Sequence, residues 1–217
     1  MNPVMRVGEQ IAEAVVAHEK VTWAEGWSRA RRLVGMVGID DSRVTDYPHE
    51  FSGGMKQRII IAMALACNPS LIIADEPTTA LDVLVQALVI KQLRDIQDRL
   101  DVSMILISHD LSVIATMCDK VAIMYAGKIV EYSSAKNVFH KASHPYTKML
   151  LEAFPSMKTT KKPISIPGYP PNLLTPPSGC RFHPRCPYAF DRCVHEEPKL
   201  RKVTEGHGAA CFLSGED

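Results

Sequence analysis

The sequence has no apolar run of the length that a membrane-spanning helix needs. Such a helix takes about 18 or more apolar residues, whereas the longest candidate runs, residues 59–65 and 71–74, end at polar residues or proline. Residues 1–6 have neither the basic start nor the apolar centre of a signal peptide. Charge of one sign is not in excess either, since 25 Lys and Arg accompany 24 Asp and Glu. This balance argues against a nucleic-acid-binding or anionic-membrane-binding surface. We therefore expect a cytoplasmic chain that reaches a membrane only through partners.

Hydrophobic periodicity predicts an α/β fold with a parallel sheet. Two short apolar runs, residues 71–75 and 104–107, flank an amphipathic helix, which is the pattern of a strand–helix–strand crossover. The first run has β-branched residues and no polar interruption, so we expect its strand to be buried on both faces. The remaining predicted elements are helices over 6–20, 23–38, 52–67, 82–100, 111–117, 134–139 and 145–154 and a hairpin over 121–132 around Ala126-Gly127.

The start of one predicted helix carries a pattern suited to phosphate binding. Ser52-Gly53-Gly54 opens the helix and is followed by Gln57. The first N–H groups of a helix have no partner within it, and glycines leave them open to a ligand at the positive end of the helix dipole. A plain helix cap would use the same residues, so this motif alone does not decide between binding and capping.

Acidic and histidine side chains follow the two predicted strands. Asp75 and Glu76 end the first strand, and His109 follows the second. Because ligands bind at the carboxyl ends of parallel strands, we expect these three residues at one edge of the sheet. There Asp75 would hold Mg²⁺, Glu76 would polarise an attacking water, and His109 would contact a terminal phosphate.

The order of these motifs resembles that of the ABC ATPases. In the terms of that family, residues 51–57 look like the signature motif, 71–76 like the Walker B strand, 79–82 like the D-loop that contains Asp82, and His109 like the switch histidine. The resemblance covers essentially the whole chain. It implies ATP and Mg²⁺ as cofactors, with Ser52, Gly53, Gly54, Gln57, Asp75 and Asp82 binding nucleotide or metal and Glu76 and His109 acting in catalysis.

Further stretches are similar to the ATP-binding subunits of dipeptide, oligopeptide and nickel importers. They are residues 2–11, 47–54, 124–131, 144–147 and the Cys-Arg-Phe-His-Pro-Arg-Cys-Pro segment at 180–187. This resemblance implies a helical subdomain over 1–50 that docks on membrane-spanning subunits, the second half of the ATPase core over 51–154, and a Pro-rich linker with a small Cys-rich module over 155–217. Basic residues in that linker are Lys158, Lys161 and Lys162.

The family's phosphate-binding loop, G-x-x-x-x-G-K-[ST], is not found in these 217 residues. The Gly127-Lys128 pair continues with Ile129 and lies in the predicted hairpin. We therefore expect a chain that corresponds to an N-terminally truncated family member, with part of the sheet uncovered and poor solubility. The sequence does not distinguish between a split gene, a start site placed downstream and a deliberately shortened chain. Since each nucleotide in this family lies between the P-loop of one subunit and the signature of the other, we predict no ATP hydrolysis by the chain alone.

Four of the six cysteines, Cys180, Cys186, Cys193 and Cys211, follow one another as C-x5-C-x6-C-x17-C. In a cytosolic protein such a group fits a metal site better than disulfides. The absence of a C-x-x-C pair speaks against a zinc ribbon, and the resemblance to peptide importers implies a [4Fe–4S] cluster. Iron–sulfur, zinc and unliganded thiols remain open alternatives.

The resemblance implies a second, full-length ATPase subunit and two permease subunits as direct partners, with a substrate-binding protein as an indirect one. The predicted place is the cytoplasmic face of the membrane. Three alternatives have different consequences: a non-catalytic or regulatory fragment, a nickel importer, and a DNA-maintenance ABC ATPase. The last normally carries inserted coiled coils or zinc modules, which this sequence lacks. The transported substrate is not encoded in these motifs.

Overall fold

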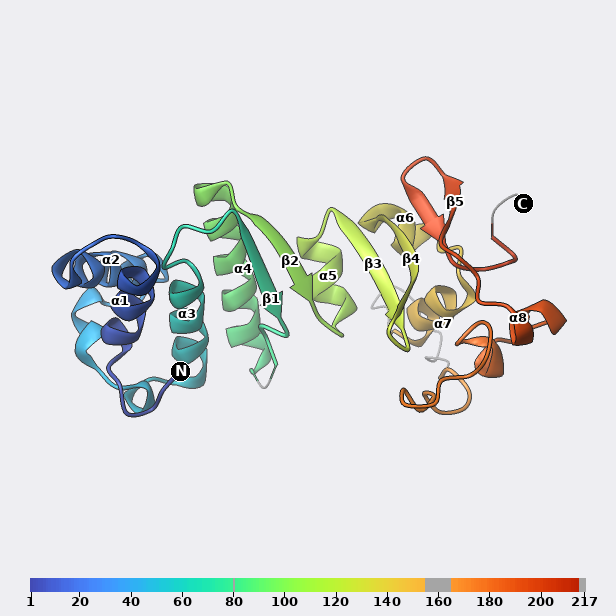
Figure 1. The fold of residues 1–217 in the computed structure, drawn as a ribbon, viewed down its shortest axis with the longest axis horizontal. Coiled ribbons are helices and arrows are strands. Elements are labelled where there is room, and N and C mark those ends of the chain that lie inside the picture. The colour runs from blue at the N-terminus through green and yellow to red at the C-terminus, as the bar shows by residue number, and fades with distance from the viewer. Residues whose placement is uncertain (80, 155–164, 215–217) are drawn as a thin grey trace. The chain divides into compact units, whose positions relative to one another are not determined.

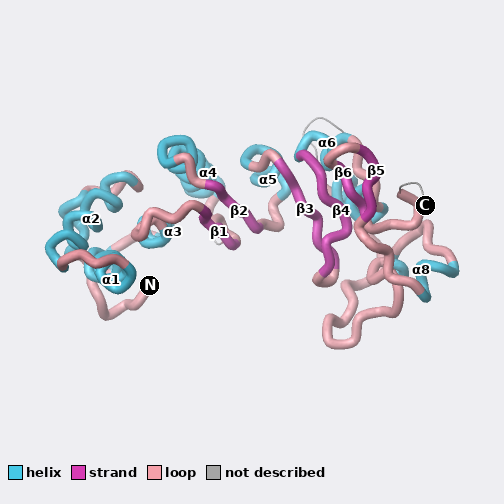
Figure 2. Tube along the Cα trace, turned by 45° about the horizontal axis from the view of Figure 1, so that its top comes forward, coloured by secondary structure: helices cyan, strands magenta, loops and turns pink. Residues whose placement is uncertain are grey.

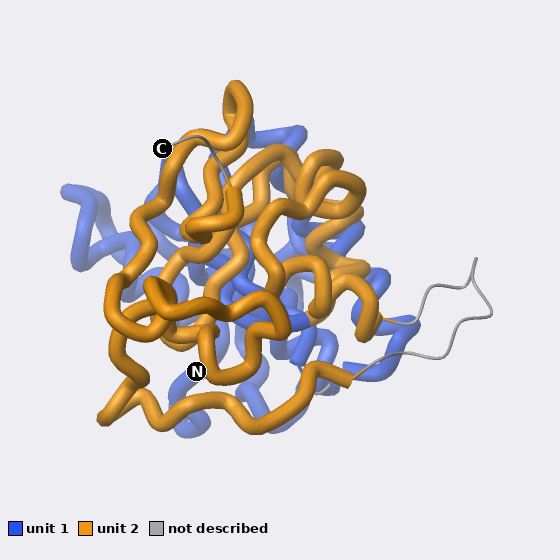
Figure 3. Tube along the Cα trace, turned by 90° about the vertical axis from the view of Figure 1, so that its right-hand side faces the viewer, with its two compact units in different colours: residues 1–109 blue, residues 110–217 orange. Residues whose placement is uncertain are grey.

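The structure is a computed structural model that describes residues 1–79, 81–154 and 165–214. The chain divides into two compact units, residues 1–109 and residues 110–217 (Figure 3). Within the described residues, no helix has both the length and the hydropathy needed to cross a membrane. The residues predicted as a basic part of the linker, Lys158, Lys161 and Lys162, lie outside the described ones, as does Ala80.

The first unit begins with two packed helices, as the apolar spacing predicts. Ile11 and Val15 of the first helix and Ala30 and Val34 of the second are fully buried. A β-carbon on Gly8 would come within 2.4 Å of the Trp27 ring, so only glycine lets these helices approach so closely. A capping box between a threonine and a glutamate starts the second helix. The elements are α1 (Val7–His18), α2 (Trp23–Met36) and the 3₁₀ turns η1 (Asp41–Thr45) and η2 (Pro48–Glu50).

The rest of the first unit forms the predicted strand–helix–strand crossover. Two strands pair in parallel with Leu71 opposite Ser103 and Asp75 opposite Ile107. One helix runs along one side of this pair, and the two views in Figures 1 and 2 agree on its place. Its buried residues Val89, Leu93 and Ile96 form the core of this part. The elements are α3 (Gly53–Ala64), β1 (Leu71–Asp75), α4 (Val83–Leu100) and β2 (Ser103–Ile107).

The prediction that the first strand is buried on both faces is wrong. Exposure alternates along β1, so that Ile72 and Ala74 are buried while Ile73 is 63% exposed. Ile105 and Ile107 of β2 are exposed as well. The reason is that, among the described residues, helices cover only one face of this two-stranded sheet. The expectation of an uncovered apolar face is thereby confirmed for the residues that the structure describes.

The second unit is built on a four-stranded antiparallel sheet with the order β3-β4-β6-β5. Its centre is the predicted hairpin, whose turn residues Ala126 and Gly127 both have positive φ, as a tight two-residue turn requires. Sequence reasoning missed the two strands near the end of the chain, which continue this sheet through pairing of Glu131 with Ala209. The strands are β3 (Lys120–Tyr125), β4 (Lys128–Ser134), β5 (Arg201–Thr204) and β6 (His207–Ala209).

Short helices surround this sheet, and most of them match the predicted ranges. Pro145 occupies the first turn of its helix, where the missing N–H of proline is harmless. Residues 165–182 contain no helix or strand, and five prolines lie between positions 167 and 177. The elements are α5 (Leu111–Met117), α6 (Ala135–His140), α7 (Pro145–Ala153), η3 (His183–Arg185) and α8 (Asp191–His195).

Candidate functional site

The tip of α3 has the geometry that its sequence predicts. Ser52 is the N-cap, with an extended backbone and a hydroxyl that accepts a hydrogen bond from the Met55 N–H at 3.4 Å. Gly53 and Gly54 form the first helical positions, and Gln57 lies in the next turn. Ser52 and Gly53 are exposed. The start of α3 is therefore accessible, with the N–H groups of Gly53 and Gly54 at the helix end and that of Met55 capped by the Ser52 hydroxyl.

The two glycines at this tip are constrained differently. A β-carbon on Gly54 would lie 2.5 Å from Val85 Cγ1 of α4, so packing between the helices requires glycine there. Among the described residues, a β-carbon on Gly53 would contact Leu81 alone, at 3.9 Å, which is an ordinary contact. The fold itself thus leaves room for a larger residue at position 53.

The second candidate group lies at the carboxyl end of the parallel strands. Glu76 follows β1 with φ of 47°, a left-handed conformation that is unfavourable for residues with a β-carbon. Its N–H donates to the Ile107 carbonyl at 2.9 Å, which ties it to the end of β2. Strained backbone of this kind is concentrated at functional sites, where surrounding contacts hold it in place.

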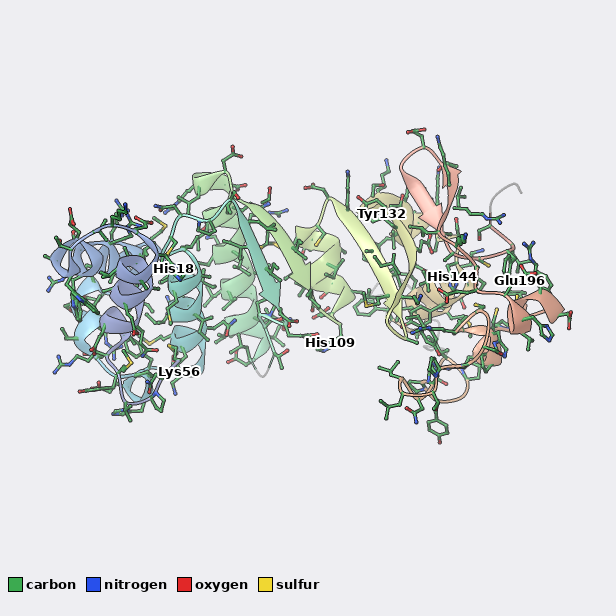
Figure 4. All side chains as sticks on the ribbon, in the orientation of Figure 1. His18, Lys56, His109, Tyr132, His144 and Glu196 are labelled. Carbon is green, nitrogen blue, oxygen red and sulfur yellow. The ribbon has the colours of Figure 1, made fainter. Side chains whose placement is uncertain are left out.

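Those contacts bring the predicted residues together at one edge of the sheet. The Glu76 carboxylate lies 3.0 Å from His109 Nδ1 and accepts hydrogen bonds from the His109 N–H at 3.2 Å and the Thr79 hydroxyl at 2.9 Å. The hydrogen bond with the His109 side chain, followed by that from Thr79, holds the pKa of Glu76 below its usual value. The His109 side chain is 81% exposed and is labelled beyond the end of β2 in Figure 4. A carboxylate and an imidazole are therefore held side by side at an accessible position.

The two other predicted ligands lie at the ends of their elements. Asp75 is exposed at the last position of β1. Asp82 is the N-cap of α4 and accepts a hydrogen bond from the Val85 N–H at 3.0 Å, so its helix start adjoins Gly54 through Val85. Sequence reasoning placed Thr79 in the D-loop-like residues 79–82 but gave it no role of its own. Its position three residues after Glu76 is the signal that could have found it.

The four C-terminal cysteines also lie together. Cys180, Cys186, Cys193 and Cys211 all line one small cavity of about 20 Å³, together with Phe182 and other apolar residues. Burial raises the pKa of the Cys180 and Cys186 thiols. In the part of the chain that the structure describes, no three His, Cys, Asp or Glu side chains are arranged to hold a single metal ion.

Comparisons with known proteins place these features in a family. Residues 1–79 match the model of the ABC transporter family, and residues 130–193 match that of the oligopeptide/dipeptide transporter C-terminal region. The oligopeptide transport ATP-binding protein OppD of Escherichia coli strain K12 is 46% identical over 220 residues, covering 100% of this chain and 65% of OppD. The dipeptide transport ATP-binding protein DppD of the same strain is 45% identical, covering 100% of this chain and 67% of DppD.

Structural similarity agrees with the sequence matches. The ATP-binding cassette MJ0796, solved as a dimer in a post-hydrolysis state with ADP and Pi, superposes with a TM-score of 0.54 at 23% identity. The match covers 62% of this chain and 59% of that one. The fold is therefore that of an ABC ATPase cassette. The chain belongs to the family of ATP-binding subunits of oligopeptide and dipeptide ABC transporters, and it spans 65% of the length of OppD.

Proposed function

We propose that this chain is part of the ATP-binding and ATP-hydrolysing subunit of an importer that takes up oligopeptides or dipeptides. The observation that carries the proposal is the pair of site halves in the first unit. One is the open helix tip at Ser52 and Gly53, and the other is the strained Glu76 held beside His109. The names of the relatives, OppD and DppD, support the peptide substrate.

The two halves serve different nucleotides in this proposal. Ser52, Gly53 and Gly54, with Gln57, bind the terminal phosphate of an ATP whose P-loop belongs to a second ATPase subunit. In the complete subunit, the residues at the sheet edge act with that subunit's own P-loop, which these 217 residues do not contain. There Asp75 holds Mg²⁺, Asp82 lies beside the shared interface, Glu76 polarises the attacking water and His109 contacts the γ-phosphate. The low pKa of Glu76 keeps its carboxylate ionised for that role.

An experiment with a mixed assembly tests this division. The 217 residues contain no P-loop, so the purified chain alone is expected to release no phosphate from Mg-ATP. When a full-length homologous subunit with an intact P-loop is added, the chain completes one site and phosphate release rises. Release by the chain alone, or no rise on mixing although the two proteins associate, would contradict the proposal.

Gly53→Ala is the sharpest variant for this test. The chain itself has room for the added β-carbon, whose closest neighbour is 3.9 Å away. The variant should therefore fold normally and still lower phosphate release of the mixed assembly by about tenfold or more, because the helix tip is no longer open. Glu76→Gln in this chain is the matched control: its own side lacks a P-loop, so the activity of the mixed assembly should not change.

The partners and domain roles follow from the same proposal. The second ATPase subunit binds across the nucleotides. Residues 1–50 dock on two permease subunits, residues 51–154 carry the nucleotide site, and residues 155–217 form the linker and Cys-rich region. A substrate-binding protein delivers peptide from the other side, and the complex holds this chain at the cytoplasmic face of the membrane. Co-purification of wild-type chain with the permeases, lost on substitution of exposed residues in 1–50, would test this arrangement.

We propose a [4Fe–4S] cluster as the occupant of the four-cysteine cavity. All four donors, Cys180, Cys186, Cys193 and Cys211, are thiols, the ligand type that such clusters take, and all four line one largely apolar cavity. Iron and sulfide analysis with visible absorption, both reduced in Cys186→Ser, would support the cluster. Zinc in place of iron would overturn it.

A further inference from the structure

The second unit contains a buried carboxylate that the proposed ATPase role does not use. Glu131 of β4 has no exposed surface. It accepts hydrogen bonds from the Ser143 N–H at 2.7 Å and the His144 N–H at 2.9 Å. His207 Nε2 of β6 lies 2.7 Å from the same carboxylate and is itself 4% exposed at its side chain. One side chain thus joins a strand of the hairpin, the start of α7 and a strand near the end of the chain.

The charge state of Glu131 determines which residue donates the hydrogen bond between Glu131 and His207. Burial alone raises the pKa of Glu131, but the hydrogen bonds that its carboxylate accepts outweigh this effect and hold the pKa below its usual value. The ionised carboxylate can only accept, so His207 donates its Nε2 hydrogen. Since the two N–H groups that it accepts from belong to the backbone, Glu131 fixes the main chain at residues 143 and 144, not only a side chain.

The segment around Cys211 is bonded on both sides to residues that lie at or next to this carboxylate. On one side, His207 bonds to Glu131 and the Ala210 N–H donates to the Val130 carbonyl at 2.8 Å. On the other, the Ser214 hydroxyl donates to the Ser143 carbonyl at 3.1 Å. The bond from Ala210 therefore ends at the residue before Glu131. The bond from Ser214 ends at Ser143, whose own N–H donates to the Glu131 carboxylate.

The other three cysteines are attached elsewhere. The Cys180 N–H donates to the Cys193 carbonyl at 2.8 Å, which closes their loop. Arg181 donates to the Ala126 carbonyl, and Arg185 donates to the Tyr125 hydroxyl at 3.3 Å, so this loop is bound to the turn of the hairpin. The four-cysteine cavity is thus assembled from two segments with separate anchors, the hairpin turn for one and residues 130, 131 and 143 for the other.

We infer that Glu131 is the positioning residue for the four-cysteine site, because through His207 and Ser143 it determines the place of Cys211. The inference uses the proposed metal role of the cysteines, but the positioning itself is a property of the metal-free chain. It explains three features that the nucleotide site leaves unused: a buried glutamate in an edge hairpin, the Ser143-His144 segment before α7, and a buried histidine four residues before the last cysteine.

Cysteine alkylation in the reduced, metal-free chain tests this inference. Rates of reaction with iodoacetamide are measured for each cysteine by mass spectrometry, with the exposed Cys67 as internal reference. In His207→Ala and in Glu131→Gln, the rate at Cys211 should rise about tenfold or more, while those at Cys180 and Cys193 stay within about twofold. His207→Gln, whose amide can still donate, should restore most of the protection.

Two control variants separate positioning from general loosening. Glu197→Ala removes the exposed ion pair of 2.8 Å with Lys128 on the same strand and should leave all rates unchanged. Arg185→Ala removes an anchor of the other segment and should accelerate Cys180 and Cys186 but not Cys211. If His207→Ala accelerates the alkylation of all four cysteines equally, or does not accelerate that of Cys211, the inference is overturned. If Glu131→Gln does not fold, the alkylation rates of the two His207 variants decide the question.

Metal loading gives a second readout. After reconstitution with Fe²⁺ and sulfide, His207→Ala should retain less than half of the iron of the wild type, and His207→Gln most of it. If the wild type takes up no iron, the cluster proposal fails. The alkylation rates in the metal-free chain still test the role of Glu131 in that case. Full iron loading in His207→Ala would contradict the positioning role.

Discussion

The two units each contain a glutamate paired with a histidine, and the surroundings of the two pairs are opposite. In the first unit, Glu76 and His109 are 3.0 Å apart, with side chains 37% and 81% exposed. In the second, Glu131 and His207 are 2.7 Å apart, with side chains 0% and 4% exposed. Residue type is the same in both pairs, so function must be judged from the surroundings.

The difference lies in what else each carboxylate contacts. Glu131 accepts two backbone N–H groups besides His207, and no surface remains for a ligand. Glu76 is held in an unfavourable backbone conformation at an accessible sheet edge, where a ligand can approach. A buried pair of this kind contributes to stability and positioning, whereas an accessible strained pair is suited to chemistry. The variants below test that distinction.

The largest effect is expected at the buried pair. Glu131→Ala leaves His207 and two backbone N–H groups without their acceptor inside the protein. Breaking a buried pair by removing one partner costs about 3–5 kcal/mol of unfolding free energy. Urea unfolding followed by circular dichroism measures this loss. Glu197→Ala removes an exposed ion pair and serves as the reference. If Glu131→Ala loses no more unfolding free energy than Glu197→Ala, the buried pair contributes no more to stability than an exposed one.

Acid should weaken the second unit through His144. Burial, opposed by the charge of Glu131 and assisted by that of Lys148, lowers the pKa of His144 from 6.5 to about 4. The folded chain therefore binds fewer protons than the unfolded chain between these values, so stability falls as pH drops from 6.5 to 4 and is unaffected above 7. The full difference is about 3 kcal/mol.

His144→Asn isolates this effect in the metal-free chain. The His144 side chain caps α7 by accepting from the Tyr146 N–H at 3.0 Å, and asparagine can cap in its place without titrating. Between pH 7 and pH 4.5, the wild type should therefore lose more unfolding free energy than the variant. The two losses should differ by about 2 kcal/mol or more. Parallel pH profiles for the two proteins would contradict the assignment.

Alanine substitutions at Gly53 and Gly54 should change the unfolding free energy by different amounts, both smaller than the loss expected for Glu131→Ala. Gly54→Ala forces a β-carbon against Val85 and should cost about 1–3 kcal/mol, as overpacking does. Gly53→Ala meets only an ordinary contact and should change the unfolding free energy by less than about 0.5 kcal/mol. Thermal unfolding of the two variants compares them directly. Equal losses would show that both glycines serve packing alone.

The smallest effect on stability is expected at the exposed pair. Glu76→Gln should leave the urea midpoint nearly unchanged, because the carboxylate is accessible to water. Glu76→Gly should raise the midpoint slightly, since glycine adopts the positive φ of 47° without strain. A marked loss of stability in Glu76→Gln would show that the exposed pair also stabilises the fold. The two pairs would then not differ in function as expected from their surroundings.

Much of the first unit could be predicted from sequence, because its elements are local and strongly periodic. The strand at Leu71–Asp75 and the helix from Val83 follow from their apolar patterns. Which face of that strand is covered could not be predicted, since an unbroken apolar run does not show one side as polar. The strands β5 and β6 were missed because they are short, and because β6 pairs with β4, more than 70 residues earlier.

The site was predicted from residue order, and its details depend on conformation. Ser52 lies at a helix start, and Glu76 meets His109, as the motifs suggested. The left-handed backbone at Glu76 had no signal, because such positions usually carry glycine or asparagine. Glu131 was not singled out either, since an acidic residue in a hairpin strand is typical of a solvent-facing position. Only the pairing with the distant β6 buries it.

Phosphate release by the mixed assembly tests the central claim most directly. The wild-type chain, added to a full-length subunit with an intact P-loop, should stimulate Mg-ATP hydrolysis. The Gly53→Ala chain should associate equally well and stimulate about tenfold less. Equal stimulation by the two chains would contradict the claim that the tip of α3 binds a nucleotide held by another subunit.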